Sequence, residues 1–577
     1  MKSIVKFFVL AVALLSMTAC INDLKVESID PNQKSDINAD LLLGKIYSTL
    51  GTTGQKGPDG DGDLDGIDEG TSSLFRMTFN LNEFPSDQIY WIWPDVGVDD
   101  IRKASWTASN ALVRGAYCRC IFDITLCNLY LEDYGENDPV KTAEVRFIRA
   151  LNYWYLLDLI GNVPFNITAE EMAAYDKKDQ LRGTKEDKPK QILRANLYDW
   201  LVKEVLSLKE SLSDVRPSYY RVDKTAADML LARLYLNAEV YSGKADWDNA
   251  AKSAYDVISS NYQLASKYEY LFMGDNDNLS AVNDAHKEII LPVAQDGQEI
   301  QSWGGSLYLI ASYRSDGMPS WGITESWKCL RTRKNLVQLF IPNVKSWNVP
   351  TAQQSPELWK SNGSANHKAI QDQMAKATSF PWGDHDVIRP YAKDQRAMLL
   401  NYREYNDSLF IVCNCGRENT DDAFFSGWLC TKFSNLMADP SRVAHDTKHP
   451  DMDLILMRKA EAYLTYAEAV LRGGASQGMT AQEAINVIRN RAQAEHLDIT
   501  LDNILDEWGR EFWGEGRRRI DLVRFGKFTG DNYAWEWKGG NQFGQVSIDA
   551  FRSIYPIPYS DLTANENLEQ NEGYAGL

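Results

Sequence analysis

Apolar residues recur at helical spacing along much of this chain, most clearly over residues 143–160. One face of this segment carries Ala143, Phe147, Ala150, Leu151, Trp154 and Leu157. An apolar stripe of this period, flanked by charged positions, predicts an amphipathic helix packed against a core. Gly161 and Pro164 come next and are expected to end the helix. Residues 101–136 show the same spacing and predict another long helix.

Two later pairs of segments carry small residues on one face, which lets helices pack closely. The first pair is 226–237 with 247–258, and the second is 454–471 with a segment that begins at Thr480. Glu483 lies three residues after Thr480, the spacing of a capping box at the start of a helix. These pairs look like tetratricopeptide units, although their period is too irregular to establish a repeat array.

Between about residues 262 and 450 the pattern changes to short apolar runs broken by Gly, Pro, Asn and Asp. This change predicts loops, short strands and irregular helices, and binding residues often lie on such supported loops. A charged helix is then expected over 506–525. The whole pattern predicts an all-α scaffold of helix pairs, with long loops and minor short strands that carry a ligand site.

The N-terminus has the layout of a secretory signal, with Lys2 and Lys6 before the apolar run 7–15. That run is too short to span a bilayer. Cys20 directly follows the small residue Ala19, which resembles a lipoprotein signal whose cysteine is acylated, for example with palmitate. The alternative is an ordinary signal peptide cut near Ala19. The expected organisation is a signal peptide over 1–19, a lipidated tether over 20–38 and a single body over 39–577.

Composition narrows the class of partner. The chain has 577 residues, with 61 Lys and Arg against 80 Asp and Glu, so its net charge is −19. A field of this sign repels phosphate backbones, and no nucleic acid is expected as a partner. The 17 tryptophans and 28 tyrosines suit sugars, because a sugar ring offers a C–H face to a flat aromatic and hydroxyls to polar side chains.

Several short motifs are spread along the chain. They are EVRFIRAL at 144–151 with GNVPF at 161–165, RKAEAY at 458–463, Glu511 with GRRRIDL at 516–522, and YPIP at 555–558 with NEGY at 571–574. Together with the signal cysteine, they resemble in kind and order the motifs of one protein family, the SusD/RagB outer-membrane lipoproteins, over nearly the whole chain. Residues 65–70 and 304–306 also resemble the family's starch-binding founding member, which favours an α-glucan ligand.

This resemblance implies an all-α body with tetratricopeptide-like helix pairs, and neither catalytic activity nor a catalytic cofactor. It implies attachment to the outer membrane through a lipid anchor, facing the extracellular side. The implied partners are starch or malto-oligosaccharides and a SusC-like TonB-dependent transporter, over which the lipoprotein sits as a lid.

The resemblance also places a glycan site. Trp91, Trp303 and Trp327 fall where the family's founding member has an aromatic arc that fits the curved face of an α-glucan helix, and Trp93 lies beside the first of them. The alternative for each tryptophan is a position in the core.

Polar glycan contacts are expected near the arc. Asp68 and Arg76 fall near such contacts, and a guanidinium suits adjacent sugar hydroxyls. The alternative is a salt bridge within a loop. A third polar contact would fall near Val96, where this chain has an apolar side chain.

A structural Ca²⁺ site is a further expectation from the resemblance. Its ligands would be Asp275, Asp277, Asp451 and Asp453, because hard oxygen ligands from two distant loops could join those loops. The alternative is that these are solvated turn residues.

Other functions stay open at the level of sequence. The ligand could be a different glycan. A glycoside hydrolase would need two carboxylates about 5–10 Å apart, and Asp68 with Glu69, or Glu511 with Glu515, are the candidate pairs. For the second pair an ion-pair network between helices is the better explanation. A helical adaptor without a sugar site is the remaining possibility.

Overall fold

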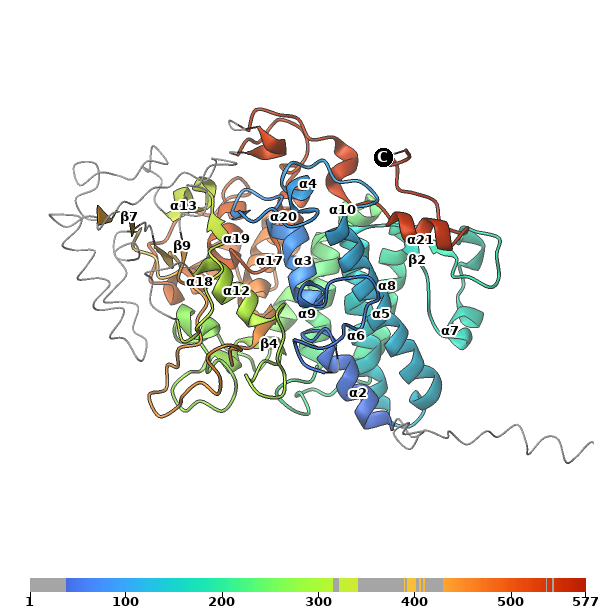
Figure 1. Ribbon diagram of the computed structural model, residues 1–577, viewed down its shortest axis with the longest axis horizontal. Coiled ribbons are helices and arrows are strands. Elements are labelled where there is room, and N and C mark those ends of the chain that lie inside the picture. Colours follow the sequence, from blue (N-terminus) through green and yellow to red (C-terminus); the bar gives the residue numbers. More distant parts are fainter. Residues whose placement is uncertain are drawn as a thin grey trace, which may run out of the picture. The chain divides into compact units, whose positions relative to one another are not determined.

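The computed structural model in Figure 1 describes most of the chain. The described residues are 38–314 except 55, 321–340, 389, 392–400, 404–405, 408–409, and 429–576 except 536, 542 and 543. The predicted signal peptide and almost all of the predicted tether therefore lie outside the described residues.

Helices dominate the described part. They are α2 (Ala39–Ser48), α3 (Leu74–Glu83), α4 (Val98–Arg102), α5 (Ala111–Tyr134), α6 (Pro139–Leu159), α7 (Ala169–Ala174), α8 (Arg194–Lys209), α9 (Lys224–Leu236), α10 (Ala238–Ser242), α11 (Trp247–Ile258), α12 (Ser306–Tyr313), α13 (Lys334–Phe340), α17 (Lys459–Leu471), α18 (Ala481–Arg491), α19 (Ile504–Phe512), α20 (Arg518–Arg524) and α21 (Tyr559–Ala564). Within the described residues, none of them has both the length and the apolar character needed to cross a bilayer.

The strands are short and pair two by two. They are β1 (Ile89–Trp91), β2 (Val163–Pro164), β3 (Gln191–Ile192), β4 (Ile289–Val293), β5 (Leu330–Thr332), β6 (Leu399–Leu400), β7 (Glu404–Tyr405), β8 (Ser408–Leu409), β9 (Leu429–Cys430) and β10 (Leu454–Arg458). The pairs are β1–β5, β2–β3, β4–β10, β6–β9 and β7–β8, all antiparallel. The all-α expectation with minor strands is confirmed.

Contacts divide the chain into two units, residues 1–44 and 45–577, and the site lies in the second. In this unit α5 packs on α6, α6 on α8, α8 on α9, α9 on α11, α11 on α17, and α17 on α18. The small residues that predicted these pairs are at the contacts, since Ala250 and Ala254 of α11 and Ala467 of α17 are fully buried. The predicted helix pairs are confirmed.

Local signals explain several helix ends. Asp138 caps α6 by accepting hydrogen bonds from the N–H groups of Val140 and Lys141. Gly161 ends α6 with φ of +86° and donates its N–H to the Leu156 carbonyl. At α18 the capping box of Thr480 and Glu483 is formed as predicted.

Other predicted helices were too long. Residues 101–136 do not form one helix, because α4 ends at Arg102 and α5 starts after the cap Asn110. Residues 454–471 begin as strand β10, whose register with β4 includes Leu454 opposite Val293. The segment 506–525 is broken between α19 and α20, where Gly514 and Gly516 adopt φ of +70° and +75°. Tertiary pairing and left-handed glycines overrode the helical period there.

Helix α3 positions the site and is buried along its whole length. Figure 1 shows it in the middle of the view, and it contacts both α5 and α20. Its cap, Ser73, accepts the Arg76 N–H and donates its hydroxyl to the Gly304 carbonyl at 2.9 Å. This bond ties the start of α3 to a segment more than two hundred residues later in the chain.

Candidate functional site

A hollow with a volume of about 720 Å³ opens in front of α3. Its walls come from the loop before α3, α3 itself, the segment after β1, the start of α5, and two single tryptophans. The lining residues are Gly66, Ile67, Asp68, Gly70, Thr71, Arg76, Met77, Asn80, Phe84, Trp91, Trp93, Pro94, Asp95, Val96, Val98, Ala111, Leu112, Arg114, Trp303 and Trp327. All five predicted glycan residues are therefore brought together around the hollow.

Three half-buried tryptophans form a row along this hollow. The ring centroids of Trp93 and Trp327 are 6.4 Å apart with a 34° tilt, and those of Trp327 and Trp303 are 6.3 Å apart with a 36° tilt. Each ring comes from a segment that is distant in sequence and is neither helix nor strand. A row of flat rings, each turned moderately from the next, presents a curved aromatic surface to a ligand.

Trp91 also lines the hollow but is enclosed by other rings, and its role as a stacking platform stays a prediction. It is 1% exposed and is stacked between Phe84, at 5.3 Å, and Tyr308, at 5.6 Å. Trp93 is in edge contact with it and takes the outer position. Strand β1 ends at Trp91, so the side-chain alternation that would put both rings on one side no longer applies two residues later.

Arg76 and Asp68 both line the hollow but do not pair in the way that a loop salt bridge requires. Arg76 donates from Nη1 to the Gly70 carbonyl at 2.9 Å, and its guanidinium lies 4.6 Å from the Tyr308 ring centroid. Asp68 is exposed at the rim. Hydrogen-bonding capacity therefore faces the same space as the tryptophan row.

Asp95 is a site residue that sequence reasoning missed. It is half-buried in the hollow, and this burial raises its pKa, while the charge of Arg76 acts in the opposite direction. Nothing in its sequence context separates it from other loop aspartates. Val96 next to it is 81% exposed and supplies an apolar edge where a polar contact had been expected.

The Gly57–Gly70 segment is irregular as far as the 3-10 helix Glu69–Thr71 and forms one rim of the hollow. Asp63 forms an ion pair with Lys45 at 2.9 Å, and Arg114 donates a hydrogen bond to the Gly66 carbonyl at 3.1 Å. Glu69 is engaged away from the hollow by the hydroxyl of Thr53, and burial raises its pKa. The pair of Asp68 with Glu69 therefore does not present two carboxylates to one ligand.

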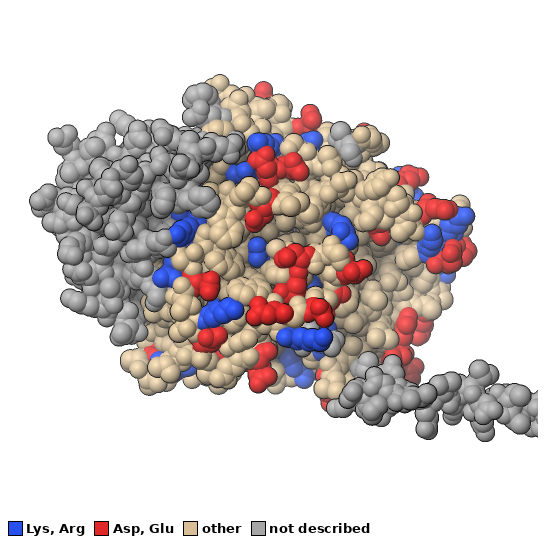
Figure 2. All heavy atoms as spheres, viewed as in Figure 1, with Lys and Arg blue, Asp and Glu red and all other residues tan. Residues whose placement is uncertain are grey.

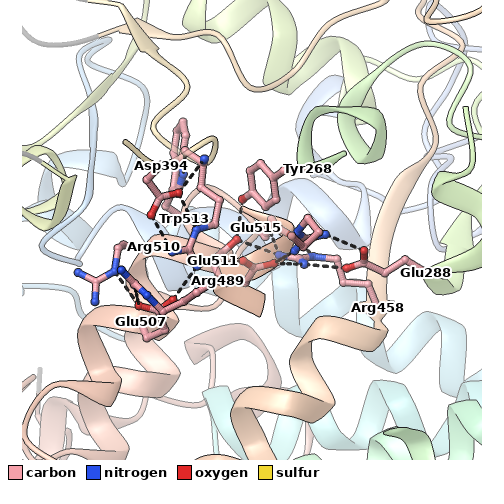
Figure 3. A network of polar contacts seen from close by, with 12 residues as sticks. Tyr268, Glu288, Asp394, Arg458, Arg489, Glu507, Arg510, Glu511, Trp513 and Glu515 are labelled. Carbon is pink, nitrogen blue, oxygen red and sulfur yellow. Dashed lines mark hydrogen bonds and ion pairs between the residues drawn. The ribbon is translucent and has the colours of Figure 1, made fainter. Parts of the chain in front are cut away.

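Glu511 and Glu515 lie in a buried ion-pair network (Figure 3). Glu511 is fully buried and accepts from Arg458 at 2.7 Å and from Arg396 at 3.2 Å. Glu515 accepts from Lys432 at 2.7 Å. The expected structural role of this motif is confirmed, and neither carboxylate lines the hollow.

Each of the four predicted calcium ligands has a protein partner, but Oδ2 of Asp453 is buried without a hydrogen-bond partner among the described residues. Asp275 accepts the Asp439 N–H at 2.9 Å, Asp277 pairs with both Nη atoms of Arg442, and Asp451 accepts the His445 N–H. Asp453 accepts one N–H from Gln295, and burial raises its pKa. Among the described residues no three His, Cys, Asp or Glu side chains are grouped to hold a metal. Calcium binding by these four aspartates therefore stays a prediction.

The chain is similar in sequence to known proteins over nearly its whole length. A family model described as "SusD family" matches residues 309–574. "Starch-binding protein SusD" of Bacteroides thetaiotaomicron is 38% identical over 99% of both chains. The chain belongs to the SusD family.

More distant SusD-like proteins agree with this assignment. "SusD-like protein P25" of Formosa agariphila is 25% identical over 78% of this chain and 77% of its own. Among solved structures, a "Laminarin binding SusD-like protein" has a TM-score of 0.61 at 19% identity, covering 94% of this chain and 100% of its own. "Surface glycan-binding protein A from Bacteroides fluxus" has a TM-score of 0.60 at 19% identity, over 93% of this chain and 99% of its own. The two structures support the SusD fold.

Proposed function

We propose that this protein is a glycan-binding member of the SusD family, not an enzyme, and that it captures starch or malto-oligosaccharides. The row of Trp93, Trp327 and Trp303 along the hollow carries this proposal. Its curved aromatic surface suits the bent face of an α-linked glucan, and Arg76, Asp68 and Asp95 offer partners for the hydroxyls. The 38% identity to a protein named for starch binding supports the choice of ligand.

The cellular setting is part of the proposal. Acylation of Cys20 would anchor the protein to the outer membrane, and the bound glycan would pass to a SusC-like TonB-dependent transporter.

The face drawn in Figure 2 gathers acidic side chains near its middle with basic ones scattered around them. With a net charge of −19, this surface is compatible with a neutral polysaccharide and opposes anionic polymers.

Isothermal titration of residues 21–577 with maltoheptaose, a cyclodextrin and a β-linked glucan tests the ligand. We expect the α-glucans alone to bind, and Trp93→Ala or Trp327→Ala to weaken binding at least about 10-fold, which corresponds to about 1.4 kcal/mol. Trp247→Ala is the matched control, because Trp247 is half-buried but does not line the hollow.

Either of two results would contradict the proposal. Preference for the β-glucan would assign a different glycan to the same hollow. Release of reducing sugar from starch, abolished by Asp95→Asn, would make the protein a hydrolase instead.

A further inference from the structure

Trp303 stands at one end of the tryptophan row and contacts side chains from two separate loops. Trp303 donates its indole N–H to Asp59 Oδ1 at 3.2 Å. The ammonium of Lys448 lies 4.4 Å from the centroid of the same indole, and it is 3.9 Å from Asp59. Asp59 comes from the Gly57–Gly70 loop and Lys448 from the segment before β10, so the three residues close a triangle across the rim.

Both loops are themselves anchored close to Trp303. A Cβ added at Gly70 would lie 3.4 Å from the Trp303 Cβ, so the first loop also passes close to the base of the tryptophan. On the other side, Asp446 accepts the N–H groups of Lys448 and His449, and the His449 ring meets the Trp303 ring edge-on at 5.4 Å. The indole is therefore held at its nitrogen by Asp59 and contacted on its ring by His449, with little free space beside its base.

We propose that Asp59 and Lys448 are positioning residues for glycan binding, which orient Trp303 and thereby set the end of the aromatic row. This inference rests on the proposed function, since it assigns a role within the same site. A half-buried tryptophan can occupy several rotamers, and fixing one of them before binding removes an entropy cost that the ligand would otherwise bear. The hydrogen bond selects the ring's orientation, and the cation over the ring adds attraction.

The first test is titration with maltoheptaose on single variants. We expect Asp59→Ala to weaken binding about 3- to 10-fold and Lys448→Met to weaken it about 2- to 5-fold, the range of exposed cation–π and charge-assisted contacts. Asp59→Asn should retain most of the affinity, because its side-chain carbonyl still accepts the indole N–H. Asp61→Ala is the matched control, since Asp61 lies in the same loop and its ion-pair partner within the described part of the chain is the exposed Lys56.

A double-mutant cycle separates positioning from general loop damage. In a Trp303→Phe background there is no indole N–H to hold, so Asp59→Ala should cause no further loss. A loss that persists in this background would overturn the proposal, as would unchanged affinity of Asp59→Ala. Tighter binding by Lys448→Met would also overturn it, because the lysine would then be covering the ring and not supporting it.

A readout without ligand distinguishes failure of this inference from failure of the proposed function. In protein labelled with fluorotryptophan, the fluorine resonance that disappears in Trp303→Phe should shift or broaden in Asp59→Ala and stay unchanged in Asp61→Ala. An unchanged resonance in Asp59→Ala would overturn the positioning role even if the wild type bound no α-glucan. A shifted resonance with no glycan binding by the wild type would instead contradict the starch proposal alone.

Discussion

Trp91 and Trp93 are separated by one residue and do different things. Trp91 is enclosed between two aromatic rings and is 1% exposed, whereas Trp93 is half-buried and belongs to the tryptophan row. We expect Trp91→Ala to lower the free energy of unfolding by about 3–5 kcal/mol, because it leaves a large cavity in the core. Trp93→Ala should change this free energy by less than about 1.5 kcal/mol and act mainly on affinity. Chemical denaturation of both variants checks the difference, and equal destabilisation would contradict it.

Glu83 is a second residue whose environment decides its behaviour. It is fully buried at the end of α3, where it accepts the N–H groups of Gly516 and Arg517, and its second oxygen has no hydrogen-bond partner among the described residues. Burial raises the pKa of Glu83 to about 8, although these amides and the charge of Arg518 act against the rise. The folded state therefore favours the protonated carboxyl.

The raised pKa of Glu83 predicts a pH dependence of stability. Because the folded pKa exceeds the unfolded one, the contribution of Glu83 is fully present below about pH 4.3 and is lost as pH rises through about 8. Glu83→Gln keeps an acceptor for the amides and removes the buried charge. We expect this variant to be more stable than the wild type above pH 8 by at least about 1 kcal/mol. Thermal unfolding between about pH 5 and 9 measures this, and parallel curves for the two proteins would argue against it.

At the scale of elements, the network in Figure 3 joins α19 to β10, α18 and the segment before β6. Burial alone would raise the pKa of Glu511, but Arg491, Arg458 and Arg396 outweigh it and lower that pKa to about 2. The contribution of Glu511 is therefore present above about pH 4.3 and is lost as pH falls towards 2. A carboxylate held between arginines in this way is a structural tie between elements.

Removing the Glu511 carboxylate should lower the stability of the folded protein. Glu511→Ala leaves three buried arginines with less compensation, and we expect the free energy of unfolding at pH 7 to fall by about 3–5 kcal/mol. Glu566→Ala is the control, because its pair with Lys185 is largely exposed and should contribute less than about 1 kcal/mol. Similar losses in the two variants, measured by denaturant titration, would show that the network is not a major tie.

Elements were predictable where one face of a segment is uniformly apolar. The segment 247–258 forms α11 with the expected bounds, and α6 differs from its expected range only at its ends. Helices were predicted wrongly where the helical spacing of apolar residues continued across a break, as at Gly514 and Gly516. The same happened where residues 454–458 pair with β4 as a strand. The spacing of apolar residues shows which face of a segment is apolar. Whether the segment pairs with a distant strand depends on residues outside it.

For the whole molecule, the sequence by itself determined the helical scaffold, its helix pairs and the family, because periodicity, caps and motifs are local properties of the chain. Only the tertiary structure decided that Trp93 lies in a row with Trp327 and Trp303, that Asp95 lines the hollow and that Asp59 contacts Trp303. These residues lie on segments without a period, where exposure depends on what the rest of the fold packs against them. Nearness between residues far apart in sequence arises from packing, and no single segment encodes it.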